Sequence, residues 1–325
     1  HLAQRNGVFG MTLNETQFGH ALYAHKTAFC FENLVVCLGS DIRSSNETYP
    51  VETTLYQSSL PHRRRPIHLS AALHPVADFP YATQVETPEE GLVLSDPYEN
   101  AYYLPGNQQL HLSRTEQISE HSHEVKETCG DFATAWLSHG VMPIDGRYEY
   151  AILVQTTPAE AEAFAARMRD ATTAEYEILS HSSRGHIVRD QRSGTTGYAL
   201  FAAGPVDGDL ISVSAPCFVM TRATENLLEM SLADPDLHMQ ATASPARLPG
   251  EYRLDDPSAQ PQSLIRITLA GTYELAAESA TCRVVRTTDD QTELEFTCRH
   301  GESIQVALHR TGMSPSPALQ ADPDK

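Results

Sequence analysis

The sequence has very little lysine and no long apolar run. Only Lys26, Lys126 and Lys325 are lysines among its 23 basic residues, so arginine carries nearly all of the positive charge. No stretch of roughly 18 consecutive apolar residues occurs, and we therefore predict no membrane-spanning helix. The N-terminus lacks a basic segment followed by an apolar one, so no signal peptide is expected in this sequence. Because the chain opens without Met, we interpret it as part of a longer protein.

Several motifs that mark enzyme classes are also missing. The sequence contains no GxSxG elbow, no GxxxxGK phosphate loop and no HExxH zinc motif. Its six cysteines form no CxxC pair and no zinc-finger spacing. These absences argue against the hydrolases, nucleotidases and metalloproteases that such motifs identify.

The charge balance limits the possible partners. A formal net charge of -19 disfavours nonspecific binding to nucleic acid or anionic lipid, so a polyanionic ligand would need a local basic patch. The run His62, Arg63, Arg64, Arg65 is such a patch, and the prolines on either side of it place it in a loop. Its arginines could bind carboxylates or sulfates of an anionic glycan through forked hydrogen bonds, or they could pair with nearby glutamates. The sequence leaves both interpretations open.

The strand pattern predicts an all-β fold. From Gly7 to Val154, short β-prone segments alternate with turn signals and no helix intervenes, which is typical of an antiparallel sandwich. The clearest unit is a hairpin that turns at Glu32-Asn33 and returns over Leu34 to Leu38, where we expect Gly39 to close it. A further strand is predicted from Val51 to Tyr56.

One helix and one domain boundary are predicted. Thr157, Pro158 and Glu160 form a cap, a first helical position and a capping box for a connecting helix over 158–169. Strand patterns then resume, so we predict a first β domain over 1–173 that is incomplete at its N-terminus, and a second over 174–310. The polar, Pro- and Ser-rich segment 311–325 is predicted to be a disordered tail.

Two side-chain pairs are weaker candidates. His121 and His123 have the alternate spacing that could bind a metal ion from one face of a strand, but no third or fourth ligand lies nearby, and a solvated loop is favoured. Cys282 and Cys298 lie symmetrically about Asp290, so a hairpin turning there would set them opposite each other as a disulfide or as two free thiols. No cofactor is predicted, and a divalent cation is left open.

Six sequence blocks resemble the C-terminal half of polysaccharide lyase family 8, with the greatest likeness to chondroitin sulfate ABC lyases. Over residues 6 to 240, the blocks occur in the order of the family and are NGVFGM (6–11), AHKTAFCFENLVVCLGSDIRS (24–44), VETTLYQ (51–57), TAWLSHG (134–140), RYEYAILVQTTP (147–158) and SLADPDLHM (231–239).

The resemblance implies a fold and a reaction. Family members are secreted or periplasmic enzymes with an α/α toroid, a large antiparallel supersandwich of galactose-mutarotase type and a smaller β-sandwich, and they cleave uronate-containing glycosaminoglycans by β-elimination. Their catalytic Asn, His, Tyr and Arg belong to the toroid, and a Glu lies just before the segment that matches NGVFGM. The sequence lacks a toroid, so we expect no catalytic residue in this chain and no activity from it in isolation.

Three roles follow from the resemblance. The expected role is the β portion of a chondroitin, dermatan or hyaluronan lyase, which forms a cleft wall and scaffold for an upstream toroid. The alternatives are a non-catalytic module that binds anionic glycans, and a structural remnant with an exposed apolar face. Neither nucleic acid nor a membrane is an expected partner.

Overall fold

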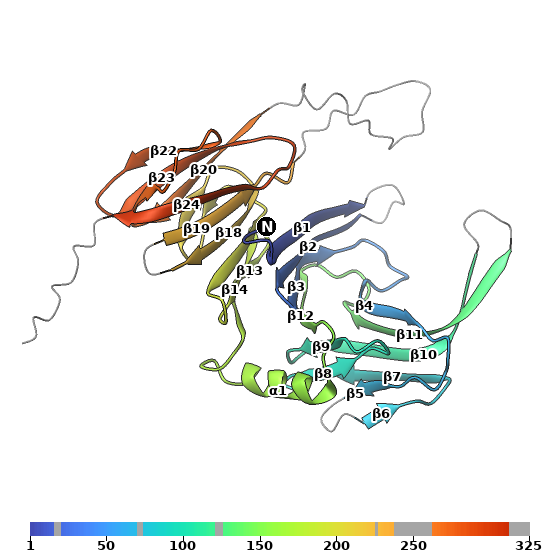
Figure 1. Cartoon of the computed structure of the whole chain (residues 1–325). Coiled ribbons are helices and arrows are strands. Elements are labelled where there is room, and N and C mark those ends of the chain that lie inside the picture. The colour runs from blue at the N-terminus through green and yellow to red at the C-terminus, as the bar shows by residue number, and fades with distance from the viewer. Residues whose placement is uncertain (16–20, 70–73, 121–125, 225–226, 237–261, 312–325) are drawn as a thin grey trace, which may run out of the picture. The chain divides into compact units, whose positions relative to one another are not determined.

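The computed structural model describes residues 1–15, 21–69, 74–120, 126–224, 227–236 and 262–311 (Figure 1). The tail predicted over 311–325 therefore lies almost wholly outside the described residues. The chain divides into two compact units, one formed by Ala3–Arg192 and the other by His1–Leu2 with Ser193–Lys325. No helix in the described part of the chain is long and apolar enough to cross a membrane.

The Ala3–Arg192 unit contains two antiparallel sheets. The larger sheet has the strand order β1-β2-β3-β12-β9-β8-β5-β6. Its strands are β1 (Asn6–Glu15), β2 (Leu22–Phe31), β3 (Leu34–Arg43), β12 (Gly146–Leu153), β9 (Ala101–Leu104), β8 (Leu92–Ser95), β5 (Ile67–Leu69) and β6 (His74–Val76). The smaller sheet has the order β4-β11-β10-β7. Its strands are β4 (Glu52–Ser59), β11 (Glu127–Ser138), β10 (Gln109–Glu120) and β7 (Tyr81–Glu86).

The two sheets share one hydrophobic core. Buried side chains of the large sheet, among them Ile42, Leu94 and Tyr150, belong to the same cluster as Leu112 and Leu137 of the small sheet. Residues one position apart point to opposite faces of a strand, so each sheet supplies every second side chain to this core. The arrangement confirms the predicted antiparallel sandwich.

The predicted hairpin is confirmed, but Gly39 does not end it. Phe31 pairs with Leu34 across the two-residue turn, and Glu32 adopts a φ of 55° there. Strand β3 continues through Gly39 as far as Arg43. The glycine is needed for another reason, since a Cβ atom at this position would lie 2.0 Å from the ring of Tyr148 on β12. Gly39 was predicted to end the strand, whereas in the structure it lies within β3 and allows the close approach of Tyr148.

Helix α1 (Pro158–Met168) confirms the predicted helix and its cap. The Thr157 hydroxyl accepts a hydrogen bond from the Glu160 N–H, and the Glu160 carboxylate accepts one from the Thr157 N–H. The helix contacts β8 and β9 (Figure 1). Phe164 packs edge-on against Tyr103, with ring centroids 5.6 Å apart. The unit ends with the hairpin of β13 (Tyr176–Ser182) and β14 (Gly185–Asp190), which contacts β2 and β3.

The other unit also contains antiparallel strands in two sheets. The first group has the order β15-β18-β19-β24-β21 and the second β16-β17-β20-β23-β22. The strands are β15 (Thr195–Leu200), β18 (Cys217–Ala223), β19 (Leu227–Ala233), β24 (Ile304–Thr311), β21 (Thr272–Leu275), β16 (Gly204–Pro205), β17 (Leu210–Val213), β20 (Ser263–Ala270), β23 (Gln291–Cys298) and β22 (Cys282–Thr287). Apolar side chains such as Met230, Ile267 and Phe296 are fully buried within it.

Candidate functional site

The predicted basic loop connects β4 to β5. Arg63, Arg64 and Arg65 are all exposed in it, as the flanking prolines indicated. The Arg65 N–H donates to the His62 carbonyl at 3.1 Å, so the run forms a tight turn. The three arginine side chains have different environments, and this difference decides which of them can bind a ligand.

Arg63 is already paired. Its Nε and Nη2 donate to the two carboxylate oxygens of Asp131 on β11 at 2.6 and 3.0 Å. Its guanidinium carbon also lies 4.2 Å from the ring centroid of Phe79. This fork lowers the pKa of Asp131, because hydrogen bonds from a cation stabilise the carboxylate. For this residue the interpretation as an internal ion pair is the better one.

Arg64 and Arg65 have no carboxylate partner among the described residues. The guanidinium of Arg65 lies 4.8 Å from the ring centroid of Tyr98. Tyr98 is fixed at both ends, since its hydroxyl donates to the Ser59 carbonyl at 2.9 Å and its N–H donates to Asp96 at 2.7 Å. Stacking occupies the face of a guanidinium and leaves its N–H groups free at the edge.

A buried arginine beneath the loop was missed by the sequence analysis. Arg114 is 0% exposed, and its guanidinium donates to backbone carbonyls: to Arg65 at 2.6 Å, to Asp78 at 3.1 Å, to Ala77 at 3.3 Å and also to Arg63. Burial lowers its pKa. Arg114 thus joins the basic loop to the segment that carries Phe79.

The sequence did contain a signal for this residue. Leu110, Leu112 and Arg114 alternate along β10, and all three are buried. A period of two places an arginine at that position on the core face, where it must find several acceptors. An arginine on the inward face of a strand is therefore a candidate for a residue that holds neighbouring backbone segments together through several hydrogen bonds.

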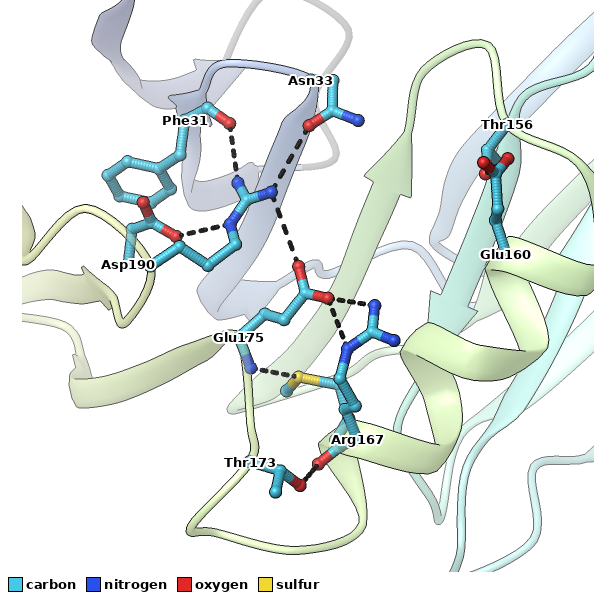
Figure 2. Close-up of polar contacts among 10 residues, drawn as sticks. Phe31, Asn33, Thr156, Glu160, Arg167, Thr173, Glu175 and Asp190 are labelled. Atoms are coloured by element: carbon cyan, nitrogen blue, oxygen red, sulfur yellow. Dashed lines mark hydrogen bonds and ion pairs between the residues drawn. The ribbon is translucent and has the colours of Figure 1, made fainter.

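A polar pocket of about 240 Å³ lies beside α1. Among its lining residues, the Glu175 carboxylate lies between the guanidinium groups of Arg167 and Arg192, and Figure 2 shows these contacts. Arg167 Nε is 2.7 Å from one Glu175 oxygen, and Arg192 Nη1 is 3.5 Å from the other. Arg192 also donates to Asp190 at 3.1 Å and to the Phe31 carbonyl at 3.2 Å. Both arginines are thus already paired with carboxylates. Because the partners lie on different elements, the cluster links α1 to the β2–β3 turn and to β14.

Two histidines of the β13–β14 hairpin, the buried His186 and the partly buried His181, contact residues of β2 and β3. The ring nitrogens of His186 lie 2.8 Å from the Thr27 hydroxyl and 2.8 Å from the Ser40 hydroxyl. Burial, with a smaller effect of the neighbouring His181, lowers the pKa of His186 to about 3. His181 Nε2 lies 2.8 Å from the Gly39 carbonyl oxygen. A neutral, fully enclosed imidazole is out of reach of a polymeric substrate, so this cluster has a structural role.

The weaker metal candidates are not placed by the structure. His121 and His123 lie in the segment 121–125, outside the described residues. In the part of the chain that is described, no group of three or more His, Cys, Asp or Glu side chains is arranged to hold a metal ion.

The expected opposition of Cys282 and Cys298 is wrong. The strand register sets Phe296 opposite Cys282, and Cys298 pairs with Ser263 on β20 instead. The turn pairs Thr287 with Thr292, so its centre lies before Asp290, and a bulge between Val284 and Arg286 shifts the register by one further position. Both thiols are free and buried. Burial raises the pKa of Cys298 to about 11.

Comparison with known proteins identifies both domains. The super-sandwich domain of polysaccharide lyase family 8 matches residues 3–165, and the C-terminal beta-sandwich domain of the same family matches residues 177–243. The predicted boundary after residue 173 falls between these matches, while the first compact unit of the structure extends to Arg192.

Individual relatives cover most of this chain. The chondroitin sulfate ABC endolyase of Proteus vulgaris is 27% identical over 298 residues, which are 91% of this chain and 27% of that enzyme. The chondroitin sulfate ABC exolyase of the same organism is 32% identical over 243 residues, which are 72% of this chain and 22% of that enzyme. The chain thus spans 22% to 27% of the length of these two relatives.

A solved structure supports the same architecture. A Paenibacillus xanthan lyase superposes with a TM-score of 0.75 over 98% of this chain and 29% of its own, at 21% sequence identity, which is a likeness of fold. The resemblance and the all-β fold class inferred from sequence are therefore confirmed. The chain belongs to polysaccharide lyase family 8, of which it contains the super-sandwich domain and the C-terminal β-sandwich domain.

Proposed function

We propose that this chain is the β portion of a glycosaminoglycan lyase that cleaves at uronic acid by β-elimination. Its role there is to form a scaffold and one wall of the substrate cleft for a catalytic α/α toroid. The observation that carries the proposal is that both β domains of the family are matched in order, and that the chain corresponds to 22% to 27% of the length of two chondroitin sulfate ABC lyases.

The described side chains support a role without catalysis. A β-elimination needs a base for the C5 proton, a group that neutralises the carboxylate and an acid for the leaving oxygen. The pocket beside α1 contains neither histidine nor tyrosine, and its arginines are paired with carboxylates. The base and acid of the reaction are accordingly assigned to the toroid.

An exposed apolar surface supports attachment to another domain. Val141, Met142 and Ile144 lie in one loop and are 48%, 48% and 85% exposed. Backbone hydrogen bonds join this loop to the segment that carries Tyr49, which is 69% exposed. A cluster of large apolar side chains in water is typical of a surface that a partner covers.

The first test measures activity of the chain alone and in a chimera. The isolated chain is incubated with chondroitin sulfate and with hyaluronan, and we expect no ultraviolet absorbance from unsaturated uronate. The chain then replaces the matching region of the Proteus vulgaris endolyase, and the folded chimera is expected to release product. Product from the isolated chain, or a folded chimera without activity, would contradict the proposed role.

An anionic-glycan-binding module without catalysis is the second candidate. It is favoured by Arg64 and Arg65, which no described carboxylate neutralises. Secretion or a periplasmic location follows from the family resemblance and stays a prediction.

A further inference from the structure

We propose that Arg64, Arg65 and the ring of Tyr98 form a subsite for sulfate or carboxylate groups of a polysaccharide, with Arg114 as its positioning residue. The ligand class rests on the proposed function, whereas the subsite itself is argued from the contacts of the basic loop.

The three arginines of the basic loop differ in whether they can receive an anion. Arg63 uses one edge of its guanidinium for the Asp131 carboxylate, so its charge is already compensated. Arg64 and Arg65 are exposed, and neither forms an ion pair with any described residue. The predicted triplet therefore separates into one structural arginine and two that can receive an anion.

Arg65 is preorganised for binding by its contact with Tyr98. A free arginine loses side-chain entropy when it binds, which reduces the affinity that it can supply. Arg65 is already restrained against Tyr98, and Tyr98 is held by Ser59 and Asp96. The edge of the stacked guanidinium remains free to form two parallel hydrogen bonds to a sulfate or carboxylate.

The basic loop is supported from beneath by Arg114. Arg114 cannot lose its proton in a protein, and here it is buried with backbone carbonyls as its acceptors. It binds the carbonyls of Arg63 and Arg65, which flank Arg64 on both sides. Removal of Arg114 would free the loop while leaving the exposed arginines in the sequence.

The choice of ligand follows from charge and shape. Nonspecific nucleic acid binding is disfavoured by the net charge of -19. A polysaccharide with one anion per sugar needs only a few local contacts, and the ring of Tyr98, which is 40% exposed, can pack against a sugar face. A sulfated or carboxylated glycan fits this surface better than a nucleic acid, whose continuous phosphate backbone needs a basic groove.

The experiment measures retention of the whole chain on immobilised chondroitin sulfate at low salt. The variants are Arg64→Gln, Arg65→Gln and the double variant, with Arg5→Gln as the matched control. Arg5 is an exposed arginine of the same unit, with a single long contact of 3.5 Å to Glu32. We expect each loop variant to lose about tenfold in affinity, since one charge-assisted contact is lost, and Arg5→Gln to bind like the native chain.

Arg114→Met tests the positioning role. We expect it to weaken binding as much as the double variant, and we expect no further loss when Arg114→Met is combined with Arg64→Gln and Arg65→Gln. A purely structural role would leave the affinity of the folded fraction unchanged. If Arg114→Met does not fold, the two loop variants still decide the proposal.

Four results would overturn the subsite. These are no retention of the native chain, loop variants that bind like the native chain, an equal loss with Arg5→Gln, and equally tight binding of single-stranded DNA. The chimera experiment is independent of this one. If the binding test fails but the chimera is active, only the subsite is wrong. If the chain binds chondroitin sulfate but the folded chimera is inactive, only the scaffold role is wrong.

Discussion

The buried ring of His186 makes the stability of the Ala3–Arg192 unit depend on pH. In the unfolded chain the imidazole has its ordinary pKa of 6.5, whereas burial lowers the pKa to about 3 in the folded state. Below pH 6.5 the unfolded chain takes up a proton that the folded ring cannot. The free energy of unfolding therefore falls as the pH falls from 6.5 towards 3, by at most about 1.4 kcal/mol per pH unit.

The expected size of this effect can be worked out for a measurable interval. Between pH 7 and pH 5, linkage gives a loss of about 2 kcal/mol from His186 alone. In His186→Gln the titrating group is gone, although the amide can still hydrogen bond to a hydroxyl. We expect this variant to be less stable at pH 7 because of imperfect packing, and to lose about 2 kcal/mol less than the native chain on going to pH 5.

The assay is urea unfolding followed by tryptophan fluorescence. Trp136 is the one tryptophan of the sequence and lies on β11, within the same unit as His186. His139, whose pKa burial lowers to about 4, titrates in both proteins and cancels in the difference. The exposed His62→Gln is the matched control and should keep the native pH dependence.

Parallel pH profiles of the two proteins would contradict a neutral His186 in the folded state. If the native chain and His186→Gln lose the same free energy of unfolding between pH 7 and pH 5, the ring is not held neutral between the Thr27 and Ser40 hydroxyls. A variant that becomes more sensitive to acid would refute the sign of the linkage.

Two further substitutions test the packing and the cap. Gly39→Ala should lower the free energy of unfolding by roughly 1–3 kcal/mol, since its Cβ would overlap the Tyr148 ring, whereas Gly7→Ala, with no atom within 4 Å of its Cβ, should not produce that loss; equal urea midpoints would contradict the close approach. Thr157→Ala should cost about 1 kcal/mol through loss of the α1 cap, and Thr157→Ser should recover most of it, as measured by thermal unfolding; an Ala variant as stable as the Ser variant would count against the capping box.

Local pattern determined much of the fold. The hairpin turn at Glu32-Asn33, the capped helix that begins at Pro158 and most strand positions follow from signals a few residues long, and the structure confirms them. Such signals act through the backbone geometry and hydrogen bonding of neighbouring residues, so they can be read without knowledge of distant contacts.

The candidate site was only partly predictable. The sequence located the basic loop because the run of arginines lies between prolines. It did not separate Arg63 from its neighbours, because Asp131 is 68 positions away and reaches the loop only through the pairing of β4 with β11.

What the sequence by itself determined is the periodic pattern of strands, the capped helix, the excess of negative charge and the resemblance to a lyase family. The tertiary structure alone decided that Gly39 makes room for Tyr148, that the turn position and a bulge together move Cys298 away from a place opposite Cys282, and that Arg114 holds the basic loop. These features depend on strand register and on the packing of one sheet against another. Both are set by contacts between residues far apart in the chain, and a single register shift changes which side chains meet.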